Sequence, residues 1–137
     1  MYCTTEQLIT WFSEQELIQR TDREPFTGAI GQTVLDEAIS AASRLVDGYL
    51  RSVYPLPLAD EVVASSPLPE ICGDIVRYTL YKGITNEEVA ARYKDAIAWL
   101  RDVQAKRVTL GAADETVAEI GSVTIAQSVS RVDWDSY

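Results

Sequence analysis

Histidine is absent from this sequence, and cysteine occurs only twice, as Cys3 and Cys72. Without an imidazole the chain has no Ser–His or Cys–His nucleophile system, and most zinc sites are excluded as well. Cys72 lies in an apolar helical pattern and is expected to be a small core residue. A disulfide between the two cysteines stays open, but two cysteines without a secretory signal give it little support.

Long apolar runs are also missing. No stretch approaches the length that spans a membrane, and the start of the chain lacks a basic region followed by an apolar one. We therefore expect a protein that is made and used in a reducing cytoplasm.

Basic side chains are few, because 12 Lys and Arg stand against 21 Asp and Glu, for a net charge of −9. Phosphate binding needs clustered Lys and Arg, so this charge balance argues against nucleic-acid binding. Gly28 and Gly31 do not fit a glycine-rich phosphate loop, and the spacing around Gly28 fails as a calcium loop. Paired carboxylates such as Glu87 and Glu88 are expected on solvated helix faces. No enzymatic activity, cofactor or metal is expected.

Apolar residues make up 47% of the 137 residues, enough for one modest core. Their spacing predicts an all-α fold, a small bundle of about four to five helices over residues 4–107. Two short helices are expected near 5–12 and 14–20, and a long one over 33–53. Four prolines predict an extended connection over 55–69. Another helix starts near Pro67 or Pro69 and runs to about Lys82, and Thr85 with Glu88 caps the last one. In this last helix the spacing predicts surface ion pairs between Glu88 and Arg92 and between Asp102 and Lys106.

The helix over 33–53 has the widest apolar stripe and is expected to be central. Because an unpaired carboxylate in a core costs several kcal/mol, we expect Leu45→Asp to unfold the protein. Its stripe consists of two adjacent lines at helical spacing: Val34, Ala38, Ala41, Leu45 and Tyr49, and beside them Leu35, Ile39, Ala42, Val46 and Leu50.

The pattern changes after Gly111. Residues 112–137 are expected to form a C-terminal arm of extended or β-hairpin type, with Gly121-Ser122 between its two halves. Val117, Ile120, Val123 and Ile125 lie there among Thr, Ser and Ala residues. Trp134 and Tyr137 follow the last predicted element, where either a disordered end or an interface anchor fits equally well.

Several stretches, in order and spacing, resemble the head–tail connector proteins of Mu-like phages and prophages. They are Met1–Thr5, Leu8-Ile9, Glu16–Asp22, Ala38 to Asp47-Gly48-Tyr49-Leu50, Tyr54-Pro55-Leu56-Pro57-Leu58, Ile71–Tyr78, Leu80-Tyr81, Arg92–Ala96 and Leu110-Gly111. Residues 112–137 resemble the family only in general character.

The resemblance implies a structural virion protein without enzymatic activity. Such connectors form a homo-oligomeric ring beneath the portal, with the symmetry of the twelvefold portal, and meet a tail-side connector or tail terminator protein. The expected place is therefore the head–tail interface of a virion assembled in a bacterial host. An acidic ring also suits a DNA conduit, because like charges repel and no basic groove captures phosphate.

Interface residues are expected at the one basic stretch and in the arm. The basic residues that we expect to face acidic groups of a neighbour or partner are Arg92, Lys94, Arg101, Lys106 and Arg107. Val117, Ile120, Val123 and Ile125 are expected to add strands to a partner sheet, and Trp134 and Tyr137 to dock in pockets of the adjoining protein. Two other classes stay open, a cytoplasmic acidic adaptor or inhibitor of a basic protein and an enzyme with a carboxylate-bound metal.

Overall fold

The computed structural model describes residues 1–23 and 25–110, and these residues form six helices without a strand. The helices are α1 (Thr5–Phe12), α2 (Glu14–Thr21), α3 (Gln32–Leu50), α4 (Asp60–Ser65), α5 (Leu68–Leu80) and α6 (Glu87–Gln104). The all-α prediction is confirmed for this part of the chain. The predicted arm over 112–137 lies outside the described residues.

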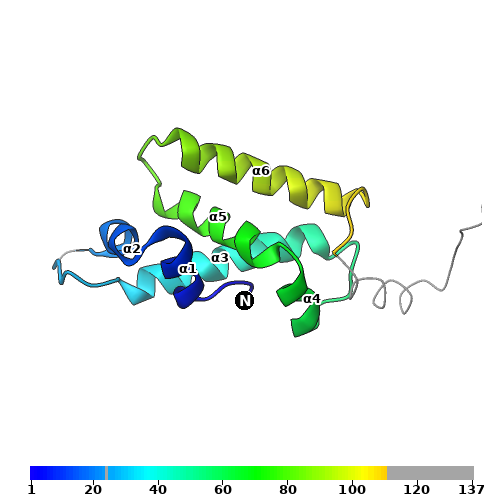
Figure 1. Ribbon diagram of the computed structural model, residues 1–137, viewed down its shortest axis with the longest axis horizontal. Coiled ribbons are helices and arrows are strands. Elements are labelled where there is room, and N and C mark those ends of the chain that lie inside the picture. Colours follow the sequence, from blue (N-terminus) through cyan, green and yellow to red (C-terminus); the bar gives the residue numbers. More distant parts are fainter. Residues whose placement is uncertain (24, 111–137) are drawn as a thin grey trace, which may run out of the picture.

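Three long helices form the body of the fold. Figure 1 shows α3, α5 and α6 running side by side, with α5 between the other two in the view, and each pair among the three is in contact. The short helices α1 and α2 lie at one end of α3, and α4 packs against α5. None of these helices is long and apolar enough to cross a membrane.

Local capping explains where the first helices begin. The Thr4 hydroxyl accepts a hydrogen bond from the Gln7 amide, and the Gln7 side chain accepts one from the Thr4 amide, which is a complete capping box. The Ser13 hydroxyl accepts a hydrogen bond from the Glu16 amide, so Ser13 ends α1 and caps α2. Both short helices therefore begin where the sequence predicts.

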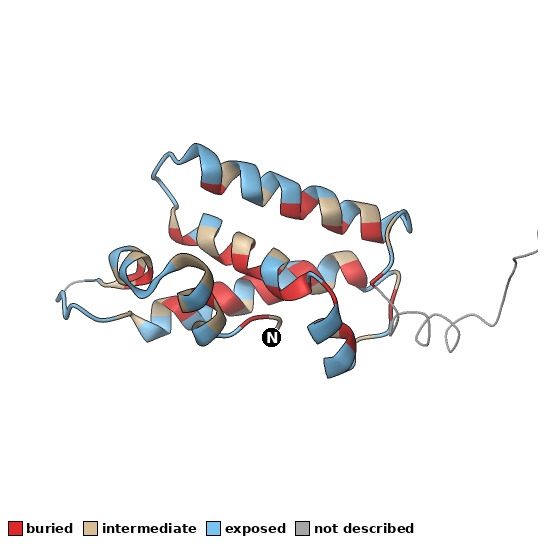
Figure 2. Ribbon diagram, in the orientation of Figure 1, coloured by how far each residue is buried: buried red, intermediate tan, exposed pale blue. Residues whose placement is uncertain are grey.

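The core contains only one of the two apolar lines predicted for α3. The line Leu35, Ile39, Ala42, Val46 and Leu50 is buried throughout, as predicted. In the other line only Ala38 is buried, and Leu45 is 37% exposed. The prediction that Leu45→Asp unfolds the protein is therefore wrong in its premise. A helix buries the strip that its neighbours cover, and Figure 2 shows buried and exposed positions alternating along α3. Leu45 lies at the exposed edge of that strip.

Several boundaries differ from the sequence prediction. The connection over 55–69 contains a helix, α4, which buries Val62 against the core. The N-cap of α6 is Asn86 rather than Thr85, because the Asn86 side chain accepts the hydrogen bond of the Val89 amide. The predicted helix 33–53 ends at Leu50.

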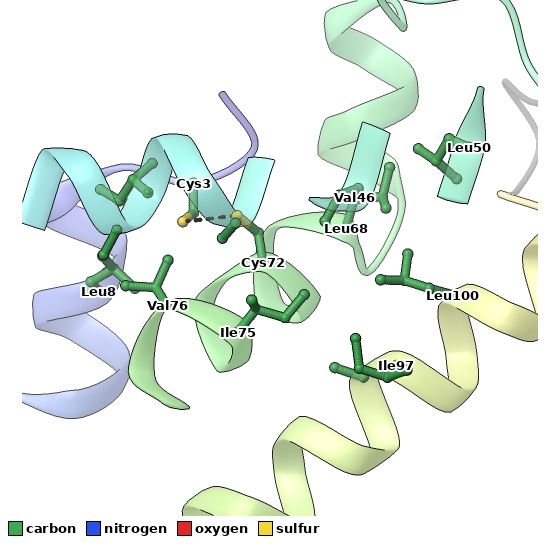
Figure 3. Packing of buried hydrophobic residues seen from close by; sticks show 14 of the residues in the cluster. Cys3, Leu8, Val46, Leu50, Leu68, Cys72, Ile75, Val76, Ile97 and Leu100 are labelled. Atoms are coloured by element: carbon green, nitrogen blue, oxygen red, sulfur yellow. Dashed lines mark hydrogen bonds between the residues drawn. The ribbon is translucent and has the colours of Figure 1, made fainter. Parts of the chain in front are cut away.

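The core extends past the predicted domain limits of 4 and 107, because Cys3 and Leu110 are both buried in it. Figure 3 shows part of this cluster, in which Val46, Leu50 and Leu68 face Leu100. Cys72 is fully buried, as predicted, and both cysteines are free thiols.

Candidate interaction surface

A pocket of about 660 Å³ opens where α5 and α6 meet α3. Leu45, Tyr78 and Ile84, which are 37%, 42% and 50% exposed, all line it. We call it the Tyr78 pocket. Its further lining residues are Ala41, Ala42, Ile75, Thr79, Tyr81, Lys82, Gly83, Thr85, Asn86, Glu87, Val89, Ala90 and Tyr93. Apolar side chains left exposed around a concave surface are typical of a binding site.

A stacked pair of tyrosines builds one wall of the pocket. The rings of Tyr78 on α5 and Tyr93 on α6 lie 3.9 Å apart between centroids, at 12° between their planes. Stacking of this kind contributes about 1 kcal/mol beyond buried area and holds the two helices in register. The stacked rings therefore hold each other in place as one aromatic wall of the pocket.

The connection between α5 and α6 carries the pocket's most exposed apolar residue. Gly83 has φ of +83°, a left-handed conformation that glycine adopts without steric cost. The Ile84 amide then donates to the Tyr81 carbonyl at 2.8 Å, closing a turn. This turn holds Ile84 at the surface.

The lining of the pocket is mostly uncharged. Its charged side chains are Lys82 and Glu87, and the rest of its lining is apolar, aromatic or neutral. Among residues 1–23 and 25–110, no three His, Cys, Asp or Glu side chains are grouped to hold a metal ion. The pocket suits an apolar or aromatic side chain of another molecule.

The five predicted basic residues differ in whether they have an acidic partner within their own chain. Arg92 lies 3.6 Å from Asp74 and 3.8 Å from Glu88, the latter as predicted from their spacing. Burial raises the pKa of the Asp74 carboxyl, and the Arg92 charge opposes that rise. Arg92 therefore has two acidic partners within its own chain.

Arg107 also has an intrachain partner. It lies 2.9 Å from Asp102, for which helical spacing predicts Lys106 as the partner instead. The helix ends at Gln104, and Lys106 adopts a positive φ of 66°, so helical spacing no longer applies there. The predicted Asp102–Lys106 pair is therefore replaced by Asp102–Arg107.

Lys94 and Arg101 are exposed and unpaired within the described part of the chain. They are seven residues apart, two turns of α6, so they share one face of the helix. Glu87, which lines the Tyr78 pocket, precedes Lys94 by the same spacing. The two basic residues thus continue the pocket's rim along α6.

The pocket has no signature in the sequence, because the exposure of Leu45 and Ile84 depends on packing between distant elements. The predicted arm residues Val117, Ile120, Val123, Ile125, Trp134 and Tyr137 lie outside the described residues.

Comparisons with known proteins confirm that the chain is similar to proteins of Mu-like phages and prophages. Residues 2–127 match the protein family described as Bacteriophage Mu, Gp36. The chain is 27% identical over 117 residues to Gene product J of Escherichia phage Mu, covering 85% of this chain and 81% of the relative. It is 27% identical over 115 residues to the Mu-like prophage FluMu protein gp36 of Haemophilus influenzae, covering 84% of this chain and 79% of the relative.

Proposed function

The chain belongs to the Bacteriophage Mu Gp36 family, and from this membership we propose that it is a structural connector between the portal and the tail of a Mu-like phage. The observation that carries the proposal is the extent of the family match, residues 2–127, which includes the whole helical domain and reaches into the arm. Copies of the chain form a ring that follows the twelvefold portal. The ring meets the portal on one side and a tail-side connector or tail terminator on the other.

Charge and chemistry support a passive conduit. With a net charge of −9, a ring of these chains repels the phosphate backbone and lets DNA pass. The Tyr78 pocket offers recognition groups and no nucleophile with an adjacent base. The proposed role therefore includes no catalysis.

The contact between neighbouring subunits is assigned to one surface, made of the Tyr78 pocket together with Lys94 and Arg101. In a closed ring each copy presents this surface to the next copy and a complementary surface to the previous one. A complementary surface must supply an apolar anchor beside negative charge.

The arm of a second copy has this chemistry. Its sequence Asp133-Trp134-Asp135 sets an aromatic ring between two carboxylates, with Tyr137 close behind. Tryptophan and tyrosine are favoured anchors of interfaces. We propose that Trp134 of one copy enters the Tyr78 pocket of the next, while the flanking carboxylates lie against Lys94 and Arg101.

Chain length allows this exchange. The pocket lies at the N-terminal end of α6, and the arm follows the C-terminal end of this helix in sequence. The 18 residues of α6 separate the two ends by about 27 Å. Residues 111–137, when extended, reach on the order of 90 Å. Val117, Ile120, Val123 and Ile125 lie between these points in sequence, and we propose that they pair as strands with the portal or with another arm.

The oligomeric state tests the proposal. The masses of the purified protein, alone and mixed with portal, are measured by native mass spectrometry. The expected result is a ring of one defined subunit number bound to portal. Leu45→Asp should abolish assembly, because it puts a carboxylate into the apolar pocket and near the carboxylates of the arm. Phe26→Asp is the matched control, since Phe26 is 72% exposed and lies outside the pocket.

Two results would contradict the proposal at different levels. A wild-type chain that stays monomeric with portal present would overturn the connector role and favour an acidic adaptor. Assembly that tolerates Leu45→Asp or Trp134→Ala would leave the connector role but remove the pocket from it. Charge reversal of Lys94 and Arg101 together should also weaken assembly, whereas reversal of the exposed Arg51 should not.

A further inference from the structure

The two cysteines of this chain lie in contact although 69 positions separate them in sequence. The Cys3 thiol donates a hydrogen bond to the Cys72 sulfur, with 3.6 Å between the two Sγ atoms. The residues are 3% and 0% exposed, and both thiols are free. Figure 3 shows the pair with a dashed line, Cys72 coming from α5 and Cys3 from the segment before α1.

The surroundings hold the pair in place. The Tyr2 amide donates to the Ser43 hydroxyl at 3.3 Å, and the Tyr2 hydroxyl donates to the Asp47 carboxylate. The Ser43 hydroxyl in turn lies 3.8 Å from the Cys72 sulfur. The N-terminal segment is therefore fastened to α3 through both the backbone and the side chain of Tyr2, with Cys3 directed at Cys72.

The two thiols differ in their tendency to ionise. The hydrogen bond from Cys3 lowers the pKa of the Cys72 thiol, and the Ser43 hydroxyl acts in the same direction against the effect of burial. The same hydrogen bond, together with burial, raises the pKa of Cys3. Cys72 is thus the better nucleophile of the pair, because the thiolate is the reactive form.

We propose that Cys3 and Cys72 are a modification site, a reversible internal cross-link that stays reduced in cytoplasm and forms a disulfide in an oxidising medium. The inference rests on the contact between the two thiols and does not depend on the proposed connector role. Its consequence is a covalent tie between the N-terminal segment and α5.

The chemistry balances with a small disulfide, such as oxidised glutathione, as the oxidant. The Cys72 thiolate attacks one sulfur of the oxidant, forming a mixed disulfide and releasing one glutathione thiolate. The deprotonated Cys3 sulfur then attacks the Cys72 sulfur and releases the second glutathione. Two electrons pass to the oxidant, whose sulfur–sulfur bond becomes two thiols, and the two cysteine protons end on them.

The residues that cover the pair on its N-terminal side also line a pocket of about 470 Å³. Its lining consists of Met1, Tyr2, Ser43, Asp47, Arg51, Leu56 and Pro57. An oxidant reaches the sulfurs only when the segment before Thr5 opens, which breaks the hydrogen bonds from Tyr2 to Ser43 and Asp47.

Oxidation of the full-length protein by glutathione disulfide tests the inference. Intact mass should fall by about 2 Da, the loss of two hydrogens, and a thiol reagent should find no free thiol after denaturation. The thermal midpoint should rise by on the order of 15 °C, because the bridge closes a long loop in the unfolded chain, and dithiothreitol should reverse both changes.

Single-cysteine variants provide the controls. Cys3→Ser and Cys72→Ser should each gain at most a glutathione adduct and show no rise in thermal midpoint. Cys3→Ser changes a residue of the N-terminal segment, so it keeps the test informative if Cys72→Ser fails to fold. Two free thiols in the wild-type protein after oxidation, or cross-links only between chains, would overturn the inference.

Discussion

Two leucines of α3 offer a sharp test of the fold. Leu50 is fully buried and lies near Val46 and Leu100, whereas Leu45, on the same helix, is 37% exposed at the mouth of the Tyr78 pocket. The same substitution, leucine to alanine, can be made at both positions. The chemistry of the change is then constant and only the packing differs.

The structure sets the expected magnitudes. Leu50→Ala removes three fully buried carbons, worth about 0.8 kcal/mol each in transfer free energy, and leaves a cavity whose cost brings the total to about 3–4 kcal/mol. Leu45→Ala leaves no closed cavity, because its neighbourhood is open to solvent, and alanine is a slightly better helix former. We expect that change to cost less than about 1 kcal/mol.

Urea unfolding followed by circular dichroism at the helix band measures both values. Because a domain of this size has a total stability of about 5–15 kcal/mol, Leu50→Ala should shift the midpoint strongly while leaving the slope unchanged. Leu45→Asp should remain folded, in contrast to the expectation from sequence. Equal losses from Leu50→Ala and Leu45→Ala would refute the placement of the core in this structure.

Three other changes probe single contacts and the arm. Glu16→Ala should lower the free energy of unfolding by about 2 kcal/mol, because Arg77, only 14% exposed, loses a two-pronged ion pair with distances of 2.6 and 3.0 Å. Glu16→Gln keeps a neutral acceptor and should therefore lower it less in the same urea assay. The amides of Thr27 and Gly28 donate to Asp22 and hold the pKa of its carboxyl below the usual value. Its stabilisation is therefore complete above the unfolded pKa and is lost as pH falls through the lower folded pKa, so the thermal midpoint of Asp22→Ala should converge on that of the wild type in acid. A chain ending at residue 111 should keep near-native helicity by circular dichroism yet fail to join heads to tails, and infectious particles assembled with it would contradict the role given to the arm.

Local signals in the sequence determined much of the helical framework. Thr4 with Gln7, and Ser13 with Glu16, are capping pairs that act over three residues, so they can be read without knowing the fold. The buried line from Leu35 to Leu50 follows in the same way from helical periodicity. The absence of histidine excludes every active site that needs an imidazole, and this exclusion follows from composition alone.

Tertiary packing decided the features that concern function. Whether Leu45 or Leu50 faces the core depends on where α5 and α6 cross α3, which no local pattern records. Arg92 pairs with Asp74 across two helices, in addition to the partner that its spacing predicted. Cys3 meets Cys72 across 69 positions. Sequence patterns report interactions within a turn or two of helix, whereas the pocket, the unpaired basic residues and the thiol pair arise from contacts between elements that only the folded chain brings together.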